Sequence, residues 1–423
     1  MAASAPSESL FGIHRGVIAL GIARMADALG NSFLIIVLPL YVASESVSGG
    51  ALGLPSSVVS GVVLALFGIV SSLTQPLAGH FSDRLGRRRA FVLAGLGIFC
   101  IANFSFSLAS SYPALFLIRA VQGFAAAFTI TASVALVSEL SIGGGRGQNM
   151  GVYNSFRLVG FGGGPLLAGL VLEHGPYTLP GGIALDGFTA CFYIAAAAAL
   201  VSTVLVVAMV EDPETTKPTH RSFAIPVRGE GQALDPVFSL GLATFMMTGC
   251  IALMSSIEPE VNARLNQGPV LFAIQFATFI GALAVVQPLV GRASDTYGRR
   301  TFILIGLAAL APTTLAQGLV TTPAQMIGAR LLQGISGALI FAPALALAGD
   351  LAKEGEVASR LSVLTVAFGL GISFGQITAG ILVQYGFVMP FAMGALLALT
   401  GVGLVYTQVH EPVPDAEVAP HAH

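Results

Sequence analysis

The stretch QPLAGHFSDRLGRR at residues 75–88 returns as QPLVGRASDTYGRR at residues 287–300, half a chain length further on. Two other motifs repeat in the same order and at nearly the same offset: RAVQG at 119–123 with RLLQG at 330–334, and GFGGGPLLAG at 160–169 with GISFGQITAG at 371–380. Three motifs in one order at one spacing indicate an internal duplication. Parallel repeats of this kind in membrane proteins place a substrate site near the bilayer midplane, between the two halves.

The composition indicates a membrane protein. Of the 423 residues, 55% are hydrophobic and only 9% are charged, whereas a soluble domain carries about 25% charged residues. The mean hydropathy is +0.84. A soluble enzyme, a disordered protein and a nucleic-acid binder are excluded at this step. The three cysteines lie far apart and indicate neither a disulfide framework nor a zinc site.

The apolar segments predict an all-α membrane protein with twelve transmembrane helices, because about 20 apolar residues are needed to cross a bilayer. We expect two pseudo-symmetric six-helix bundles, 1–210 and 237–423, with a cytoplasmic linker at 211–236 and a cytoplasmic tail at the end of the second bundle. The predicted spans are 17–42, 57–79, 90–109, 113–138, 149–172, 188–210, 237–257, 268–290, 301–319, 324–349, 361–384 and 388–407.

The basic residues predict the orientation. With twelve spans, fourteen of the 19 Lys and Arg residues fall in loops on one side of the membrane. Cytoplasmic loops carry the excess of Lys and Arg. We therefore expect a multi-pass protein of the plasma membrane with both termini and the linker in the cytoplasm.

The repeated motifs also carry a family resemblance. The motif at 79–88 resembles the signature loop between helices 2 and 3 of the major facilitator superfamily, and the motif at 119–123 resembles its helix-4 motif. The motif at 160–169 resembles the helix-5 motif of the proton-coupled exporters, with Ala168 where glycine is usual. The resemblance covers essentially the whole chain. It implies the major facilitator fold and points to the twelve-helix drug:proton antiporter branch.

The two basic loops are interpreted as gates. The resemblance implies that they act as a latch between the halves, whereas a topology-setting basic loop is the simpler alternative. Glu139 and Asp350 close the preceding spans of the two halves on the same side, and are candidate partners of the arginines. Thr296 replaces Arg84 in the second copy, which we expect to be the weaker latch. The gate-loop candidates are Gly79, Asp83, Arg84, Gly86, Arg87, Arg88, Asp295, Arg299 and Arg300.

Charged residues inside a span are expensive and mark candidate functional sites. Arg24 and Asp27 lie on one face of the first span, with Asn31 one turn further. Asp27 is the only carboxylate that the predicted spans place well inside the bilayer, so we predict that Asp27, Arg24 and Arg119 couple transport to protons. A static Arg24–Asp27 ion pair that stabilises the helix is the alternative.

Polar side chains in other spans are candidates for the substrate cavity. Arg119 with Gln122, and Arg330 with Gln333, form the same polar face in the two halves. Each such group can equally serve as a structural hydrogen bond between helices. The cavity candidates are Asn31, Gln122, Arg330, Gln333, Gln275 and Gln376.

The glycine-rich helix is interpreted as a packing hinge formed by Gly160, Gly164, Pro165 and Gly169. Proline kinks a helix and glycines flatten its face. We expect this helix to pack on the pseudo-symmetric span 361–384 of the other half.

The sequence has no phosphate-binding GxxxxGK[ST] motif and no HExxH motif. We predict no enzyme activity, no cofactor and no metal site. The leading function is proton-coupled efflux of a small apolar or amphiphilic molecule by alternating access, by a monomer whose partners are its substrate, protons and the bilayer, not nucleic acid. An anion uniporter or proton symporter, and a non-transporting receptor or scaffold, are the alternatives.

Overall fold

The computed structural model describes residues 9–10, 13–44, 46–49, 53–141, 146–178, 180, 182, 184–212, 227–228, 233–352 and 357–410. These residues include twelve helices that are long and apolar enough to cross a membrane, which confirms the predicted number of spans. In the first half they are α1 (Arg15–Ala43), α2 (Ser56–Leu85), α3 (Arg88–Ser105), α4 (Tyr112–Glu139), α5 (Arg146–His174) and α6 (Gly187–Met209).

The second half repeats this order. Its long helices are α7 (Pro236–Ala252), α9 (Pro269–Tyr297), α10 (Arg299–Leu319), α11 (Pro323–Asp350), α12 (Val357–Leu382) and α13 (Met389–Gln408). Shorter elements are the 3₁₀ helices η1 (Phe106–Leu108), η2 (Leu253–Ser256) and η3 (Val383–Tyr385), the helix α8 (Glu258–Leu265), and the hairpins β1 (Ser9–Leu10) with β2 (Ile13–His14) and β3 (Tyr177–Thr178) with β4 (Ala184–Leu185).

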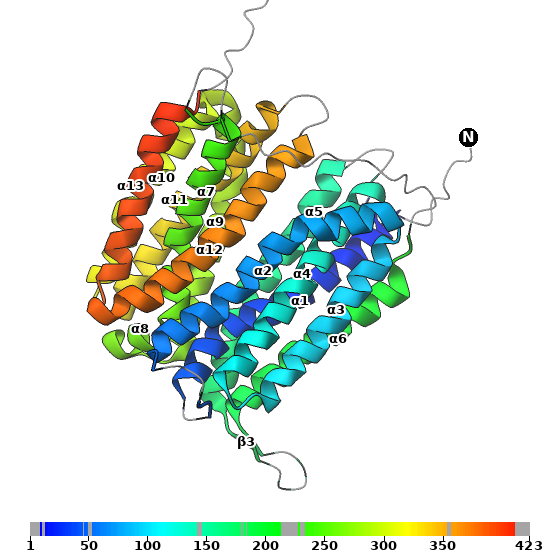
Figure 1. Cartoon of the computed structure of the whole chain (residues 1–423), viewed down its shortest axis with the longest axis vertical. Coiled ribbons are helices and arrows are strands. Elements are labelled where there is room, and N and C mark those ends of the chain that lie inside the picture. The colour runs from blue at the N-terminus through cyan, green and yellow to red at the C-terminus, as the bar shows by residue number, and fades with distance from the viewer. Residues whose placement is uncertain are drawn as a thin grey trace, which may run out of the picture.

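The helices form two bundles that lie side by side in Figure 1. Helices α1–α6 pack mainly on one another, as do α7 and α9–α13. Two ends of the molecule are distinguished below. The linker side is the upper end in Figure 1, where α6 ends and α7 begins; the hairpin side is the lower end, with α8 and the β3–β4 hairpin.

Local signals in the sequence set where the helices begin and end. The Asp235 carboxylate accepts hydrogen bonds from the backbone amides of Val237 (2.9 Å) and Phe238 (3.1 Å) and so caps α7. The same carboxylate pairs with Arg360 of α12 at 2.8 Å. Thr322 and Gln325 form a capping box at the start of α11.

The first gate motif is mostly helical, which corrects the expectation of a loop over residues 79–89. Helix α2 continues through the motif to Leu85, and the chain turns only at Gly86, whose φ of 63° suits glycine. Gly79 therefore lies inside the helix, where a β-carbon would lie 3.3 Å from the Thr131 side chain of α4. Helix α9 likewise continues to Tyr297, past the predicted end at residue 290.

The halves meet along two helix pairs, α2 with α12 and α5 with α9. This arrangement is different from the expected packing of α5 on the span 361–384. That span forms most of α12, which packs on α7 and α2 instead. Each glycine-rich helix therefore has one partner in its own half and one in the other half, because the duplicated motif repeats both contacts.

The molecule is closed on the hairpin side and open on the linker side. Along α2, no residue from Ser57 to Ser72 is exposed, because α12 covers this segment, with the Ser373 hydroxyl donating to the Ala65 carbonyl at 3.0 Å. Beyond Ser72, an exposed stripe begins with Leu73 (61% exposed) and Leu77 (59%). The two halves thus separate towards the linker side.

Candidate transport site and gates

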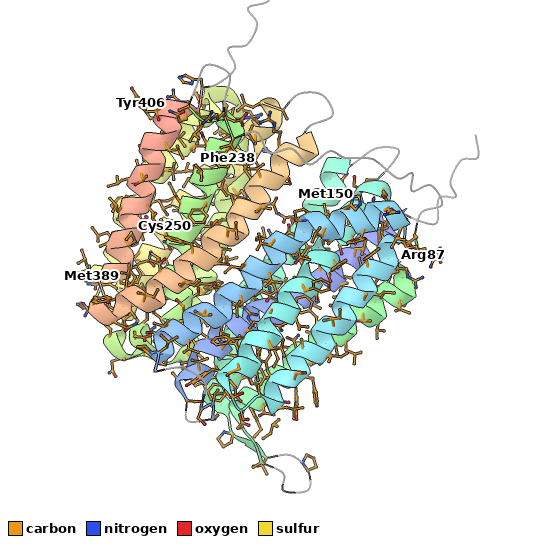
Figure 2. The ribbon with its side chains drawn as sticks, in the orientation of Figure 1. Arg87, Met150, Phe238, Cys250, Met389 and Tyr406 are labelled. Carbon is orange, nitrogen blue, oxygen red and sulfur yellow. The ribbon has the colours of Figure 1, made fainter. Side chains whose placement is uncertain are left out.

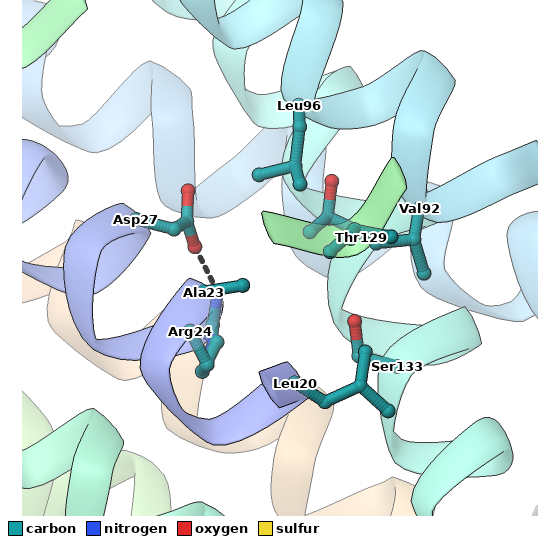
Figure 3. Close-up of a pocket in the computed structure, with 9 residues that line it drawn as sticks. Leu20, Ala23, Arg24, Asp27, Val92, Leu96, Thr129 and Ser133 are labelled. Atoms are coloured by element: carbon teal, nitrogen blue, oxygen red, sulfur yellow. Dashed lines mark hydrogen bonds and ion pairs between the residues drawn. The ribbon is translucent and has the colours of Figure 1, made fainter. Parts of the chain in front are cut away.

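The predicted acid–base pair forms inside the first half. Asp27 is 5% exposed, and one of its oxygens forms an ion pair with a terminal guanidinium nitrogen of Arg24 (Figure 3). Arg24 Nε is also buried and has no hydrogen-bond partner. The pair therefore rests on one contact, not on the bidentate geometry that makes Arg–carboxylate pairs strongest.

A small cavity adjoins this pair. Side chains of α1, α3, α4 and α6 line it, and Figure 3 shows Thr129 and Ser133 of α4 facing Asp27 across it. Its volume of about 10 Å³ is room for about one water molecule. The cavity lies within the first bundle and not between the halves, so it suits a proton or a water molecule and not an organic substrate.

Tyr153 belongs to this polar cluster, although sequence reasoning missed it. It is buried (4% exposed) on α5, and it interacts electrostatically with Arg24, Asp27 and Arg157. Arg157 Nε also donates to Asn154 at 2.9 Å. The available signal was the spacing of Tyr153 and Arg157, four residues apart and hence on one helix face.

Arg119 lies in a hydrogen-bonded network that joins three helices of the first half. It donates to the Val63 carbonyl of α2 at 3.2 Å and to the Gln122 side chain at 3.0 Å. Gln122 in turn donates to Asn103 of α3 at 2.6 Å. The guanidinium also lies 4.9 Å from the centre of the Phe67 ring. Within the described residues, this network does not bring Arg119 into contact with Asp27.

Arg330 repeats the arrangement in the second half. It donates to Gln333 at 2.6 Å, and Gln333 donates to Thr314 of α10 at 3.2 Å. The rings of Phe279 and Phe276 lie 4.6 Å and 5.7 Å from its guanidinium. Thr314 and Phe279 correspond in the repeat to Asn103 and Phe67. Both arginines are at most 2% exposed, so each is enclosed within its own bundle.

The other cavity candidates are separated in space. Gln275 of α9 is fully buried and donates to Gln267 at 2.7 Å, near the hairpin side. Gln376 of α12 lies against Ser255 of η2 at 3.4 Å, and its side-chain oxygen has no partner. Asn31 is partly buried on α1.

The surface between the halves is apolar where α5 meets α9. The rings of Phe161 and Phe276 lie 5.9 Å apart across this junction. Ile35 of α1 and Leu283 of α9 pack against the same cluster, together with Phe279. An apolar or amphiphilic molecule would find matching surface here.

The gate arginines form ion pairs with the two acids that the sequence suggested. Arg88 contacts Glu139 at 3.1 Å and donates to Ser82 at 2.9 Å. Arg299 pairs with Asp350 and, at 2.9 Å, with Asp295. Each cluster joins helices of one half. The Arg88 cluster connects α2 and α3 to α4, and the Arg299 cluster connects α9 and α10 to α11.

The remaining gate residues lie around these pairs. Arg84 and Arg87 are exposed, and Arg300 donates to the Tyr406 carbonyl at 2.7 Å. Figure 2 shows Arg87 at the linker side of the first bundle. The side chain of Asp83 lies outside the described residues.

The predicted hinge glycines are contact points between helices. A β-carbon at Gly160 would lie 2.1 Å from the Met25 carbonyl oxygen, and one at Gly164 would lie 2.5 Å from the Leu29 carbonyl oxygen, both on α1. Gly169 instead faces Pro269 of α9 in the other half, at 3.0 Å. Pro165 lies inside the continuous helix α5. Gly371, Gly375 and Gly380 repeat these contacts on α7 and α2.

Two related six-helix bundles that meet at a partly apolar surface, closed at one end and open at the other, are the arrangement expected of a membrane transporter built from parallel repeats. The family model of the Major Facilitator Superfamily matches residues 20–251 and again residues 237–422. The chain therefore belongs to the major facilitator superfamily, whose members are transporters and not enzymes.

The chain is similar, at low identity, to proteins named for drug resistance. It is 25% identical to Multidrug resistance protein 2 of Bacillus subtilis over 89% of this chain and 90% of that protein. It is also 25% identical to the Quinolone resistance protein NorA of Staphylococcus aureus, over 51% of this chain and 53% of that protein.

Solved structures share the fold. A bacterial homologue of the human lysosomal transporter Spinster, in an inward-facing and occupied conformation, superposes with a TM-score of 0.72 at 14% identity, over 93% of each chain. The human organic anion transporter MFSD10 has a TM-score of 0.68 at 19% identity, over 92% of this chain and 99% of that chain.

Proposed function

We propose that this transporter exports a small apolar or amphiphilic molecule in exchange for protons, with Asp27 as the coupling acid. The observation that carries the proposal is the form of the Arg24–Asp27 pair: one contact, a buried guanidinium nitrogen without a partner, and a water-sized cavity beside the carboxylate. A pair that only stabilised the helix would be expected to use both guanidinium arms. A single contact beside a water-sized cavity is easier to break when the carboxylate takes a proton.

The substrate class follows from the apolar junction of α5 and α9 and from the names of the similar proteins. The rings of Phe161 and Phe276 offer an apolar wall on both halves. Multidrug and quinolone resistance proteins are among the relatives, which supports export of an organic molecule.

The anion-carrier alternative finds less support. The sequence favours it through the four arginines that the predicted spans contain against one well-buried carboxylate. Arg119 is enclosed in its bundle by a glutamine and one phenylalanine ring, and Arg330 by a glutamine and two phenylalanine rings. An anion would have to displace these contacts before it reached either guanidinium.

We assign the linker side to the cytoplasm, because the basic gate motifs lie there and cytoplasmic loops are enriched in Lys and Arg. With this orientation the structure corresponds to the inward-open state, ready to take up a substrate from the cytoplasm or the inner leaflet. The division into bundles 1–210 and 237–423 around the linker 211–236 remains part of this proposal, as does action as a monomer.

The test uses purified protein in liposomes and ethidium, an amphiphilic organic cation, as the probe. An acidic interior is expected to drive ethidium accumulation in the wild type, and Asp27→Asn is expected to abolish this accumulation. Exchange of labelled for unlabelled ethidium at equal pH should survive in Asp27→Asn, because the amide resembles the protonated acid. Glu211→Gln is the control, since Glu211 is an exposed acid of the linker side.

Gradient-driven accumulation at the wild-type rate in Asp27→Asn would contradict the coupling role. Loss of both accumulation and exchange in this variant, with the protein still folded, would assign Asp27 to the structure of the site instead.

A further inference from the structure

A second buried carboxylate lies outside the membrane spans, at the hairpin side. Glu258 is the first residue of α8 and is fully buried. One of its oxygens accepts a long hydrogen bond, 3.4 Å, from the Asn262 side chain, and the other oxygen has no partner. An ionised carboxylate in such a place is costly, because burial without a counter-charge penalises the charged form.

The groups around Glu258 supply no compensating positive charge among the described residues. On α8 itself, Glu260 is another acid, and Arg264 is exposed and lies 4.8 Å from the centre of the Phe387 ring. The neighbouring η2 has no titratable group, and neither has α9 from Pro269 to Gly291. On the hairpin half of α1, Tyr41 is the only titratable group, and its hydroxyl donates to the Ala109 carbonyl at 2.9 Å.

Desolvation accordingly raises the pKa of Glu258 well above its usual value, and the hydrogen bond from Asn262 opposes this only in part. Burial also raises the pKa of Glu260. The raised pKa values agree with the geometry, because a buried carboxyl group without a counter-charge is more stable in its neutral form.

Helix α8 forms part of the closed end between the halves. It belongs to the second half but packs on α1 of the first half, and Figure 1 shows it at the closed, lower end of the molecule. Its residues Val261 and Leu265 are buried in one cluster with Phe33 and Leu34 of α1. When the halves separate on this side, the α1-facing surface of α8 loses its cover.

A chain of side-chain amides connects Glu258 of α8 to α9 of the same half. Asn262 accepts a hydrogen bond from Gln267 at 3.1 Å, and Gln267 is bonded to the buried Gln275 of α9 at 2.7 Å. Gln275 was predicted as a cavity residue. It connects through Gln267 and Asn262 to the α8 carboxyl group, so these four side chains form one network.

We propose that Glu258 is a proton-binding site of the hairpin-side gate: the gate closes around the protonated carboxyl group, and its opening to water releases the proton. Glu258 would be a second proton-binding group beside Asp27. This inference rests on the proposed function only in taking the hairpin side as the outside of the membrane. Acid on the hairpin side would then favour closure and the return of the empty transporter to the inward-open state.

The sign of the pH dependence follows from linkage. A carboxyl group whose pKa is higher in the closed state favours that state fully below its open-state pKa, and this preference is lost as the pH rises towards the closed-state pKa. Within that window, each pH unit shifts the closed-to-open equilibrium by up to about tenfold. Rising pH therefore opens the gate.

Hydrogen exchange of the α8 amides in the full-length protein in lipid nanodiscs tests the proposal, after correction for the intrinsic pH dependence of exchange. In the wild type, protection of residues 258–265 is expected to fall about tenfold or more between pH 5.5 and pH 7.5. Glu258→Gln should stay protected at both values, because the amide cannot ionise. Glu173→Gln, a matched change at an exposed acid on the same side, should behave as the wild type.

Protection that does not change with pH in the wild type, or a pH dependence that persists in Glu258→Gln, would overturn the proposal. Persistence in Glu258→Gln with loss in Glu260→Gln would move the site to Glu260. The assay needs neither substrate nor gradient. In Asp27→Asn the absolute protection is free to shift with the conformational equilibrium, but the fall in protection between pH 5.5 and pH 7.5 is expected to persist and still to require Glu258. Failure of proton-coupled efflux and failure of the Glu258 site are therefore observed separately.

Discussion

Replacing Gly160 by alanine is expected to destabilise the first bundle. The new β-carbon would lie 2.1 Å from the carbonyl oxygen of Met25, whereas ordinary contact begins at 3.4 Å. Helices α1 and α5 would have to move apart by about 1.3 Å at this point, along the most extensive helix–helix contact among the described residues. Overpacking of this kind typically costs about 1–3 kcal/mol, and rigid backbone on the receiving side places this site at the upper end.

Gly163 of the same helix provides the matched control. A β-carbon there meets nothing within 4 Å, so Gly163→Ala changes only the helix propensity, which favours alanine over glycine by about 1 kcal/mol. We expect this variant to be as stable as the wild type or slightly more stable. The difference between the two variants isolates the contact with α1 from the general effect of removing a glycine.

Thermal unfolding followed with a thiol-reactive fluorophore measures the effect, because Cys191 and Cys250 are buried and free in the folded protein. The midpoint for Gly160→Ala should fall by several degrees, and that for Gly163→Ala should not fall. Equal midpoints for the two variants would refute the reasoning, since they would mean that α1 and α5 can separate at no cost.

Two further predictions concern polar contacts. Glu139→Gln should lower the unfolding midpoint more than Asp350→Asn in the same thermal assay, because the arginine that Glu139 pairs with is 7% exposed and the one that Asp350 pairs with is 21% exposed; equal effects would contradict this ranking. Gln122→Leu should cost about 1–3 kcal/mol because it leaves Arg119 and Asn103 with fewer partners in a buried site, and an unchanged midpoint in that variant would show that water replaces the amide.

The fold was largely predictable because the bilayer restricts the possible structures. Only helices of about 20 residues and closed β-barrels can span it, the apolar segments have the length of helices, and the duplicated motifs indicate the two halves directly. The predicted partner of α5 was wrong because a glycine-rich face indicates that another helix approaches closely but does not identify that helix. Gly160 faces α1 and Gly169 faces α9, and nothing in the motif distinguishes the two partners.

The site was only partly predictable from spacing along the chain. The Arg24–Asp27 pair is a local contact of three residues and therefore follows from helix geometry. The partners of Arg119 depend on which face of α4 turns inwards, and the motif spacing does not determine that rotation. Glu258 was not among the predicted site residues because it lies in a short polar helix after a span, where an acid normally faces water.

The same contacts indicate where the molecule can move. Within each half, glycines bring α5 onto α1 and α12 onto α7, and buried arginine networks tie α4 and α11 to their neighbours. These contacts leave little freedom inside a bundle, because packed interiors do not deform continuously. The contacts between the halves also include close glycine packing, the Phe161–Phe276 ring contact and hydroxyl–carbonyl bonds such as Ser57 to Gly380 at 3.0 Å, but along α2 and α12 they lie on the hairpin side of the molecule and end near the middle of these helices. A transition to the outward-open state would therefore break the α2–α12 and α5–α9 contacts on the hairpin side first, and Glu258 lies where that separation admits water.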